Sequence, residues 1–293
     1  MSIKQLAKLY LVIFIALSVL VFFLASIIFF LNKDVSFTKI VVKYINAIDY
    51  KFILFILVGF IAQMIDGTLG MAYGVSSTSF LLSFGISPAA ASASVHTAEI
   101  FTTGISGFSH WKFNNVNKKL LMLIVLPGAI GAILGSLLLV YFDGNLLKPY
   151  IAIYLLIMGL RILYKAFTKR TKKTNFNQYS LLGFIGGFVD SSGGGGWGPV
   201  VTSTLIGVGR NPTITIGTVN AAEFIIALVT SIVFAITLSF NYWQIILGLV
   251  IGGIFAAPLA AYFCHKIKSN LALLLVGILI VILSVRTLIL SLT

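Results

Sequence analysis

Four of the seven acidic residues lie inside strongly apolar stretches of the sequence, where a carboxylate is unusual. Within a helical bundle in a membrane, a carboxylate costs several kcal/mol unless it is paired, protonated or hydrated. Such groups can bind protons or gate a path beside a cavity. We therefore predict proton-coupling roles for Asp66, Asp190, Glu99 and Glu223.

The two aspartates also allow a structural interpretation. Each precedes a glycine-containing stretch, so Asp66 and Asp190 could cap the N-termini of half-helices, where the helix dipole favours negative charge. The sequence leaves both interpretations open for this pair. Glu99 and Glu223 lie deep in an apolar run, which favours a functional role for them.

The segment DSSGGGGWGP, from Asp190 to Pro199, contains four consecutive glycines. Successive backbone N–H groups in a glycine-rich turn form a concave anion site, and helix N-termini add positive dipole ends. Close helix packing explains some membrane glycines, but packing motifs space them about one turn apart. No Lys or Arg is expected at this depth, so dipoles would replace charges. We predict that a small oxyanion binds here and at nearby hydroxyls, through Gly193, Gly194, Gly195, Gly196, Ser191, Ser192, Gly70, Ser76, Ser77, Thr78 and Thr202.

His96 and Asn220 are polar residues that each precede one of the two glutamates by about one helical turn. An imidazole in this position could titrate or bind an anion. We include both residues among the substrate-binding candidates, although a buried histidine held by hydrogen bonds is the more common case. Trp197, beside the glycine run, is expected to form a wall of the cavity.

The composition defines the class of protein. The chain is 59% hydrophobic and 9% charged, and several apolar runs reach the roughly 18 residues expected of a membrane span. We predict an all-α polytopic membrane protein. The net charge of +13 is attributed to loops that set orientation and meet anionic headgroups, rather than to a nucleic-acid surface. One cysteine and three histidines without metal-ligand spacing predict neither metal nor cofactor.

The sequence repeats itself with an offset of 124 positions, without a gap, over about 47 residues. Glycine and polar positions both match, so chance is an implausible explanation and the halves are expected to be structural repeats. Identical pairs include Gly59/Gly183, Asp66/Asp190, Gly70/Gly194, Gly74/Gly198, Thr78/Thr202, Ser79/Ser203, Pro88/Pro212 and Glu99/Glu223.

Each half is predicted to contain two short apolar segments around a glycine-rich break, followed by three longer spans. Segments of about 10–15 residues are marginal for crossing a membrane core, so a re-entrant or broken-helix hairpin is expected. The predicted division is an N-terminal transmembrane helix and loop (1–50), a first transmembrane repeat (51–168), a basic cytoplasmic linker (169–179) and a second transmembrane repeat (180–293).

Charge predicts the orientation of the spans. The lysine- and arginine-rich stretch 165–173 is expected in the cytoplasm, together with the N-terminus. A hairpin plus three spans gives each half an odd number of crossings, so the second repeat should be inverted relative to the first. The loop 32–51 counts against this topology, because it would lie outside despite four lysines.

The doubled pattern GF-x5-D-x3-G-x3-G, followed by TSxL, a proline and a glutamate, resembles the sulfite exporter TauE/SafE family. The segment VDSSGGGGWGPVVTSTLI carries the strongest likeness, and the resemblance extends from about Phe52 to Leu290. It implies transport of sulfite, sulfonates or related organosulfur anions across the cytoplasmic membrane. The first half departs from the glycine-rich pattern at Leu69, Met71 and Ala72, which suggests that the second-half loop contributes more of the anion site.

Together these features predict a proton-coupled secondary transporter working by alternating access, not an enzyme. An intramembrane hydrolase and a cation carrier using the buried carboxylates are the alternatives. The expected partners are a small anion and the lipid bilayer, without nucleic acid, and homo-oligomerisation is left open.

Overall fold

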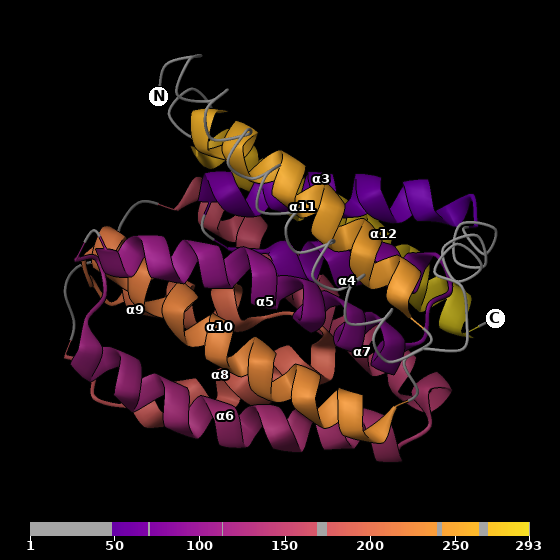
Figure 1. Ribbon diagram of the computed structural model, residues 1–293, viewed down its shortest axis with the longest axis horizontal. Helices are drawn as coiled ribbons and strands as arrows, with labels where there is room; N and C mark the ends of the chain where they lie inside the picture. The colour runs from indigo at the N-terminus through magenta and orange to yellow at the C-terminus, as the bar shows by residue number, and fades with distance from the viewer. Residues whose placement is uncertain are drawn as a thin grey trace, which may run out of the picture.

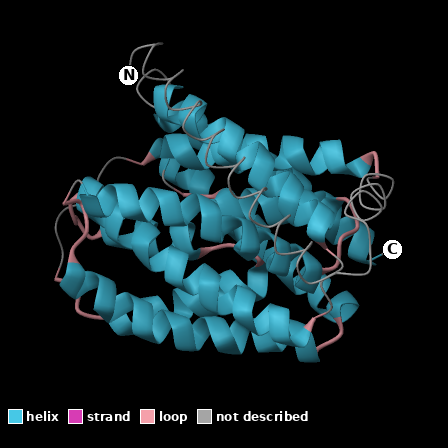
Figure 2. Cartoon of the chain, viewed as in Figure 1, coloured by secondary structure: helices cyan, strands magenta, loops and turns pink. Residues whose placement is uncertain are grey.

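The computed structural model of the protein describes residues 49–69, 71–112, 114–168, 175–238, 242–263 and 269–292. All regular elements in these ranges are helices, as Figure 2 shows, which confirms the predicted all-α class. The predicted N-terminal span, Gly70 and residues 169–174 of the predicted linker lie outside the described residues.

The same succession of elements occurs in both halves of the described chain. The first half forms α3 (Lys51–Leu69), α4 (Tyr73–Ser83), α5 (Pro88–Lys112), α6 (Lys118–Tyr141) and α7 (Gly144–Phe167). The second half forms α8 (Tyr179–Gly193), the short π-helix η1 (Gly198–Thr202), α9 (Ser203–Gly207), α10 (Pro212–Thr237), α11 (Trp243–Phe263) and α12 (Ser269–Leu292). Each half thus has a helix, a break, a short helical segment and three long helices.

The helices before the two breaks are longer than the sequence predicts. Helix α3 continues to Leu69 and α8 to Gly193, so each helix extends past its aspartate into the glycine-containing stretch that follows. Gly194, with φ of 70°, ends α8 in the left-handed conformation that glycine adopts without steric cost. Asp66 and Asp190 therefore belong to the last turns of helices rather than to the breaks.

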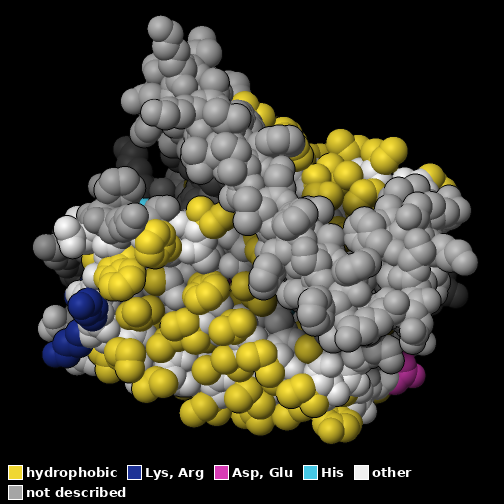
Figure 3. Space-filling model, in the orientation of Figure 1, with side chains coloured by type: hydrophobic (Ala, Val, Ile, Leu, Met, Phe, Trp, Pro, Cys, Tyr) yellow, Lys and Arg dark blue, Asp and Glu magenta, His cyan; other side chains and the backbone are white. Residues whose placement is uncertain are grey.

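The surface and the helix lengths suit a membrane. By length and composition, α6, α7, α10 and residues Leu273–Leu292 of α12 are able to cross one. Large apolar side chains are exposed on these helices, for example Leu126 at 59% and Ile130 at 58%. Figure 3 shows hydrophobic side chains over the middle of one face, with basic side chains at one end and acidic ones at the other. A multi-pass membrane protein is the class that this pattern indicates.

Four helix pairs make the main packing contacts, and most of the helices lie along the long axis of the molecule (Figure 1). Helix α6 packs on α8 and α11 packs on α3, while α5 packs on α10 and α7 on α12. Gly59 of α3 faces the backbone of Leu249, and its repeat equivalent Gly183 of α8 faces the backbone of Ile124. Here the glycines do allow close helix approach.

Helices α5 and α10, which occupy equivalent places in the two repeats, run antiparallel. Residue numbers rise along α5 as they fall along α10 in the contacts that join Gly104 to Phe224, Gly107 to Ala221 and His110 to Gly217. Helices α7 and α12 are also antiparallel, because Gly159 faces Ile280 while Gly277 faces Leu163.

Candidate substrate and coupling site

The breaks of the two repeats meet each other inside the protein. A Cβ atom added to Gly74 would lie 2.7 Å from the Cα of Gly195 and 2.9 Å from Oε1 of Glu99. The whole stretch from Gly193 to Thr202 is buried. Three of the regions singled out in the sequence, the two breaks and one of the glutamates, therefore come together at one place.

Asp190 joins the end of α8 to the helix that follows the break. Its Oδ1 accepts a hydrogen bond from the backbone N–H of Trp197 at 2.8 Å, and its main-chain oxygen accepts from Gly195 N–H at 2.8 Å. In the first repeat, the backbone N–H of Tyr73, which opens α4, faces the carboxylate of Asp66. Both contacts span seven residues, so the capping interpretation of the aspartate pair has direct geometric support.

The second oxygen of Asp190 contacts a histidine from the other repeat. Oδ2 lies 3.1 Å from Nε2 of His96, and both side chains are almost fully buried. The opposite ring nitrogen, Nδ1, lies 2.8 Å from the main-chain oxygen of Ser92. That oxygen can only accept, so this contact is a hydrogen bond in the tautomer whose Nδ1 carries the ring proton.

In that tautomer, the number of protons shared by the pair follows from its hydrogen bonds. A neutral imidazole has one N–H, which Nδ1 already uses, so Nε2 of the neutral ring can only accept. The contact with the Asp190 carboxyl then requires one further proton between Nε2 and Oδ2. The pair is either an imidazolium with a carboxylate or a neutral His96 with a protonated Asp190, and its net charge is zero in both forms.

Glu99 lies beside this pair with one oxygen unbonded. The side chain is 1% exposed, and Oε2 has no hydrogen-bond partner among the described residues. Its carboxyl group is within electrostatic range of Asp66, Asp190 and Glu223. If all four carboxyl groups were ionised, they would repel one another. The group is therefore more stable when it binds protons or another cation. Ligand-type atoms of His96, Glu99 and Asp190 all lie within 4.8 Å of one another.

The glycine run is packed closely, and part of its hydrogen bonding is fixed. Thr78 Oγ1 donates to the Gly194 carbonyl, and Tyr154 OH donates to the Gly195 carbonyl at 2.8 Å. Ser191 Oγ pairs with Thr230 Oγ1 at 2.6 Å. By contrast, the buried hydroxyls of Ser76 and Thr202 have no hydrogen-bond partner among the described residues.

The sequence matches the family model described as Sulfite exporter TauE/SafE over residues 55–287. The chain belongs to this family. A protein of Bacillus subtilis (strain 168), "Probable membrane transporter protein YtnM", is 46% identical over 249 residues, which is 82% of this chain and 83% of that relative. No solved structure matches the chain. The family and the relative are both described as transporters, so this TauE/SafE protein is a membrane transporter and not an enzyme.

The equivalent residues His96 and Asn220 differ in their partners in this TauE/SafE protein. Asn220 donates to Ser106 Oγ at 2.9 Å on α5, whereas His96 contacts Asp190. The predicted equivalence in sequence therefore does not extend to their hydrogen bonds. The substrate-binding role of each residue stays a prediction.

Sequence reasoning missed the contribution of α7 to the site of this TauE/SafE protein. Tyr154 contacts both Gly193 and Gly196 in addition to its bond to Gly195. Half-buried Lys165 places Nζ 3.5 Å from Ser203 Oγ and 3.5 Å from Met71 Sδ. We expected no basic group near the breaks, but Lys165 reaches the short helix that follows one of them. Neither residue belongs to a repeat motif, so the sequence offered no signal for them.

Proposed function

We propose that the protein is a secondary transporter that moves a small sulfur-containing oxyanion, such as sulfite or a sulfonate, across the cytoplasmic membrane by proton-coupled alternating access. The observation that carries this proposal is the buried contact between His96 and Asp190, placed where the breaks of the two repeats meet. The N-terminus is proposed to be cytoplasmic.

The inverted relation of the two repeats is part of the proposal. Its support is the antiparallel packing of α5 on α10, which start at the equivalent residues Pro88 and Pro212. Two equivalent helices that run in opposite directions imply that the repeats have opposite orientations. The first helix of each repeat packs on an equivalent helix of the other repeat, α3 on α11 and α8 on α6. This exchange of partners agrees with a twofold relation between the repeats.

Substrate binding is proposed at the meeting point of the breaks. A buried hydroxyl without a partner is rare in proteins, because leaving it unbonded costs about 1–3 kcal/mol. Ser76 and Thr202 follow the two breaks and each carry such a hydroxyl. They could donate to an oxyanion that enters when the breaks separate. The π-helical form of η1 agrees with this role, since π-helical turns occur often at functional sites.

Proton coupling is proposed to run through His96 and Asp190, with Glu99 as the next acceptor. Glu99 is the nearby acid with an unbonded oxygen. The helices on which these groups lie, α5 and α8, belong to different repeats. A movement of one repeat against the other would therefore separate the pair and release its proton. This movement links proton binding to the opening of the breaks.

Uptake of radiolabelled sulfite into proteoliposomes tests the function, with and without a pH gradient and with taurine, sulfoacetate and sulfate as competitors. We expect saturable uptake that a pH gradient accelerates and that only some competitors block. Absence of uptake under every gradient, from protein shown to be folded, would overturn the assignment of sulfite as a substrate.

A cation carrier is the second candidate, and the close approach of His96, Glu99 and Asp190 favours it. One imidazole nitrogen and carboxylate oxygens are ligands suited to a cation. The same proteoliposomes distinguish the two functions. A carrier of this kind would transport a divalent or monovalent cation without any oxyanion, and Glu99→Gln would abolish that flux.

A further inference from the structure

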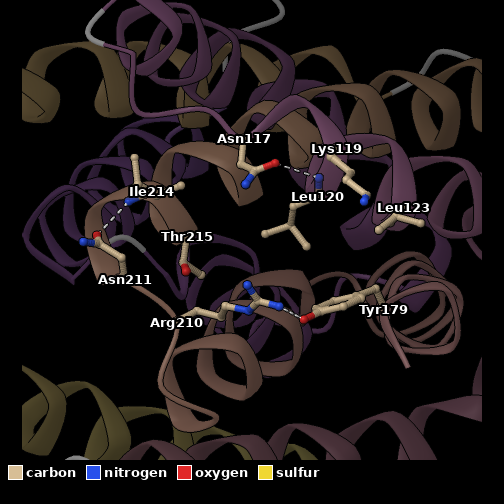
Figure 4. A pocket seen from close by; sticks show the side chains of 9 residues that line it. All are labelled: Asn117, Lys119, Leu120, Leu123, Tyr179, Arg210, Asn211, Ile214 and Thr215. Carbon is tan, nitrogen blue, oxygen red and sulfur yellow. Dashed lines mark hydrogen bonds between the residues drawn. The ribbon is translucent and has the colours of Figure 1, made fainter. Parts of the chain in front are cut away.

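A cavity of about 420 Å³ lies at the end of the molecule where α6, α8 and α10 begin. Its lining includes Lys119 and Arg210, and no acidic residue lines it among the residues that the structure describes. Figure 4 shows these two cations on opposite sides of the cavity, with Asn117 and Asn211 at its rim. We propose that this cavity is a peripheral capture site for the transported oxyanion. This inference rests on the proposed anion transport.

The helix starts make the cavity electropositive beyond its two side-chain charges. Asn117 caps α6 by accepting from Leu120 N–H at 3.0 Å, and Asn211 caps α10 by accepting from Ile214 N–H at 3.2 Å. Both residues line the cavity, so the positive ends of two helix dipoles lie at its edge. Tyr179, the first residue of α8, lines it as well.

The cationic groups are available for a ligand. Arg210 is held by Tyr179, because it donates to the phenol oxygen and its guanidinium carbon lies 5.2 Å from the ring centroid. No carboxylate neutralises it among the described residues. The guanidinium has five N–H donors, so one contact with Tyr179 leaves others for an oxyanion. Lys119 is exposed at the opposite wall.

Thr215 adds a hydroxyl group to the lining of the cavity. Its side chain is 1% exposed, lines the cavity and points toward Arg210 in Figure 4. No hydrogen bond of its hydroxyl occurs among the described residues. A hydroxyl so placed adds a neutral donor between the two cations, which is a donor set suited to a sulfite or sulfonate group.

Contacts of Trp197 link the region of the cavity to the proposed central site. Trp197 is fully buried among the same three helices, because its ring meets Gly128 of α6 and Gly186 of α8 and its Nε1 donates to Val219 of α10. Thr215 and Val219 are separated by four residues, about 6 Å along the helix. Trp197 therefore contacts α10 one turn from Thr215, and its backbone N–H donates to the carboxylate of Asp190.

Removing the positive charges that line the cavity tests the proposal in the transport assay. Lys119→Gln and Arg210→Gln should each raise the KM for sulfite several-fold at low salt and leave kcat unchanged, since the site acts before the central one. Lys118→Gln is the matched control, because Lys118 precedes Lys119 and does not line the cavity. An equal KM in Lys118→Gln and Lys119→Gln would overturn the proposal.

A binding measurement separates failure of this site from failure of the transport function. Sodium sulfate is added to purified protein in detergent and the unfolding midpoint is compared with that in sodium chloride of equal ionic strength. We expect a larger rise for the wild type than for the Lys119→Gln/Arg210→Gln variant, and the general stabilisation by sulfate cancels in this difference. Equal rises would overturn the site even if sulfite is transported, whereas a larger wild-type rise without sulfite transport would overturn only the proposed function.

Anionic lipid headgroups share the chemistry of the ligand. Transport is therefore measured in phosphatidylcholine vesicles with and without phosphatidylglycerol. A wild-type KM that is independent of phosphatidylglycerol supports capture of the free anion. A KM that rises with phosphatidylglycerol in the wild type, but not in the double variant, would assign the cavity to lipid and overturn the capture site.

Discussion

Nε2 of His96 lies 3.1 Å from Oδ2 of Asp190, and the two residues come from different repeats. The other nitrogen of the ring and the other oxygen of the carboxyl group are both held by main-chain groups, Ser92 O and Trp197 N–H. The pair is thus held at both ends, and with Nδ1 protonated it shares one further proton between Nε2 and Oδ2. The pair connects the end of α8 to α5.

Replacing Asp190 by Asn separates the coupling role of the carboxyl group from its capping role. The amide oxygen can still accept from Trp197 N–H, so the fold should survive. The amide cannot exchange a proton with His96, so the pH gradient should no longer drive sulfite uptake. Uptake in proteoliposomes with an imposed gradient measures this effect, and an undiminished, gradient-driven flux would exclude Asp190 from coupling.

Asp190→Ala is the companion variant for the cap. It removes both hydrogen bonds of the carboxyl group and leaves Trp197 N–H buried without its partner. We expect a loss of about 1–3 kcal/mol in stability, seen as a lower unfolding midpoint in detergent. Asp190→Asn should stay close to the wild type in that measurement, and equal losses would argue against the capping role.

The sequence predicted the helical class and the succession of short and long segments in each half, because long apolar runs and an internal repeat can be read from the sequence directly. It also identified His96, Asp190 and Glu99 as candidates, since a polar group in an apolar stretch is conspicuous. It could not reveal the pairing of His96 with Asp190, because 94 residues separate them. The contacts of Tyr154 with the glycine run are equally non-local, and one tyrosine in an apolar helix carries no pattern.

Tyr154→Phe tests whether that non-local contact holds the second break in place. The phenol oxygen donates to the carbonyl of Gly195 at 2.8 Å. Its removal leaves a buried acceptor unpaired, so the expected loss of stability is about 1–3 kcal/mol. Thermal unfolding in detergent measures it. Tyr150→Phe is the control, since Tyr150 on the same helix is 65% exposed, and a similar loss in both variants would contradict the assigned contact.

Alanine substitutions distinguish three kinds of glycine. At Gly195, φ is 145° and a Cβ would overlap the backbone of Gly74 and Val75, so Gly195→Ala should prevent stable folding or transport. Gly85 has φ of 85° but no atom near its Cβ direction, so alanine should cost only about 1–2 kcal/mol of backbone strain. Gly207 is free of both constraints, and alanine there should be neutral or stabilising by up to about 1 kcal/mol. Unfolding midpoints measure the order, and tolerance of alanine at Gly195 would contradict the close approach of the two breaks.

Ser87 and Asn211 provide a direct test of the inverted topology. They are equivalent in the two repeats, they precede the prolines that start α5 and α10, and both are exposed. In a variant lacking Cys264, Ser87→Cys and Asn211→Cys should react with a membrane-impermeant thiol reagent from opposite sides of the membrane. Sealed right-side-out and inside-out vesicles give the two sides, and the variant lacking Cys264 alone gives the background. Because α5 and α10 run antiparallel, their starting ends lie at opposite ends of the bundle. The topology predicted from charge places the start of α10 in the cytoplasm, so Asn211→Cys should be labelled from the cytoplasmic side. Labelling of both positions from the same side would rule out inversion and, with it, the alternating movement of opposed repeats.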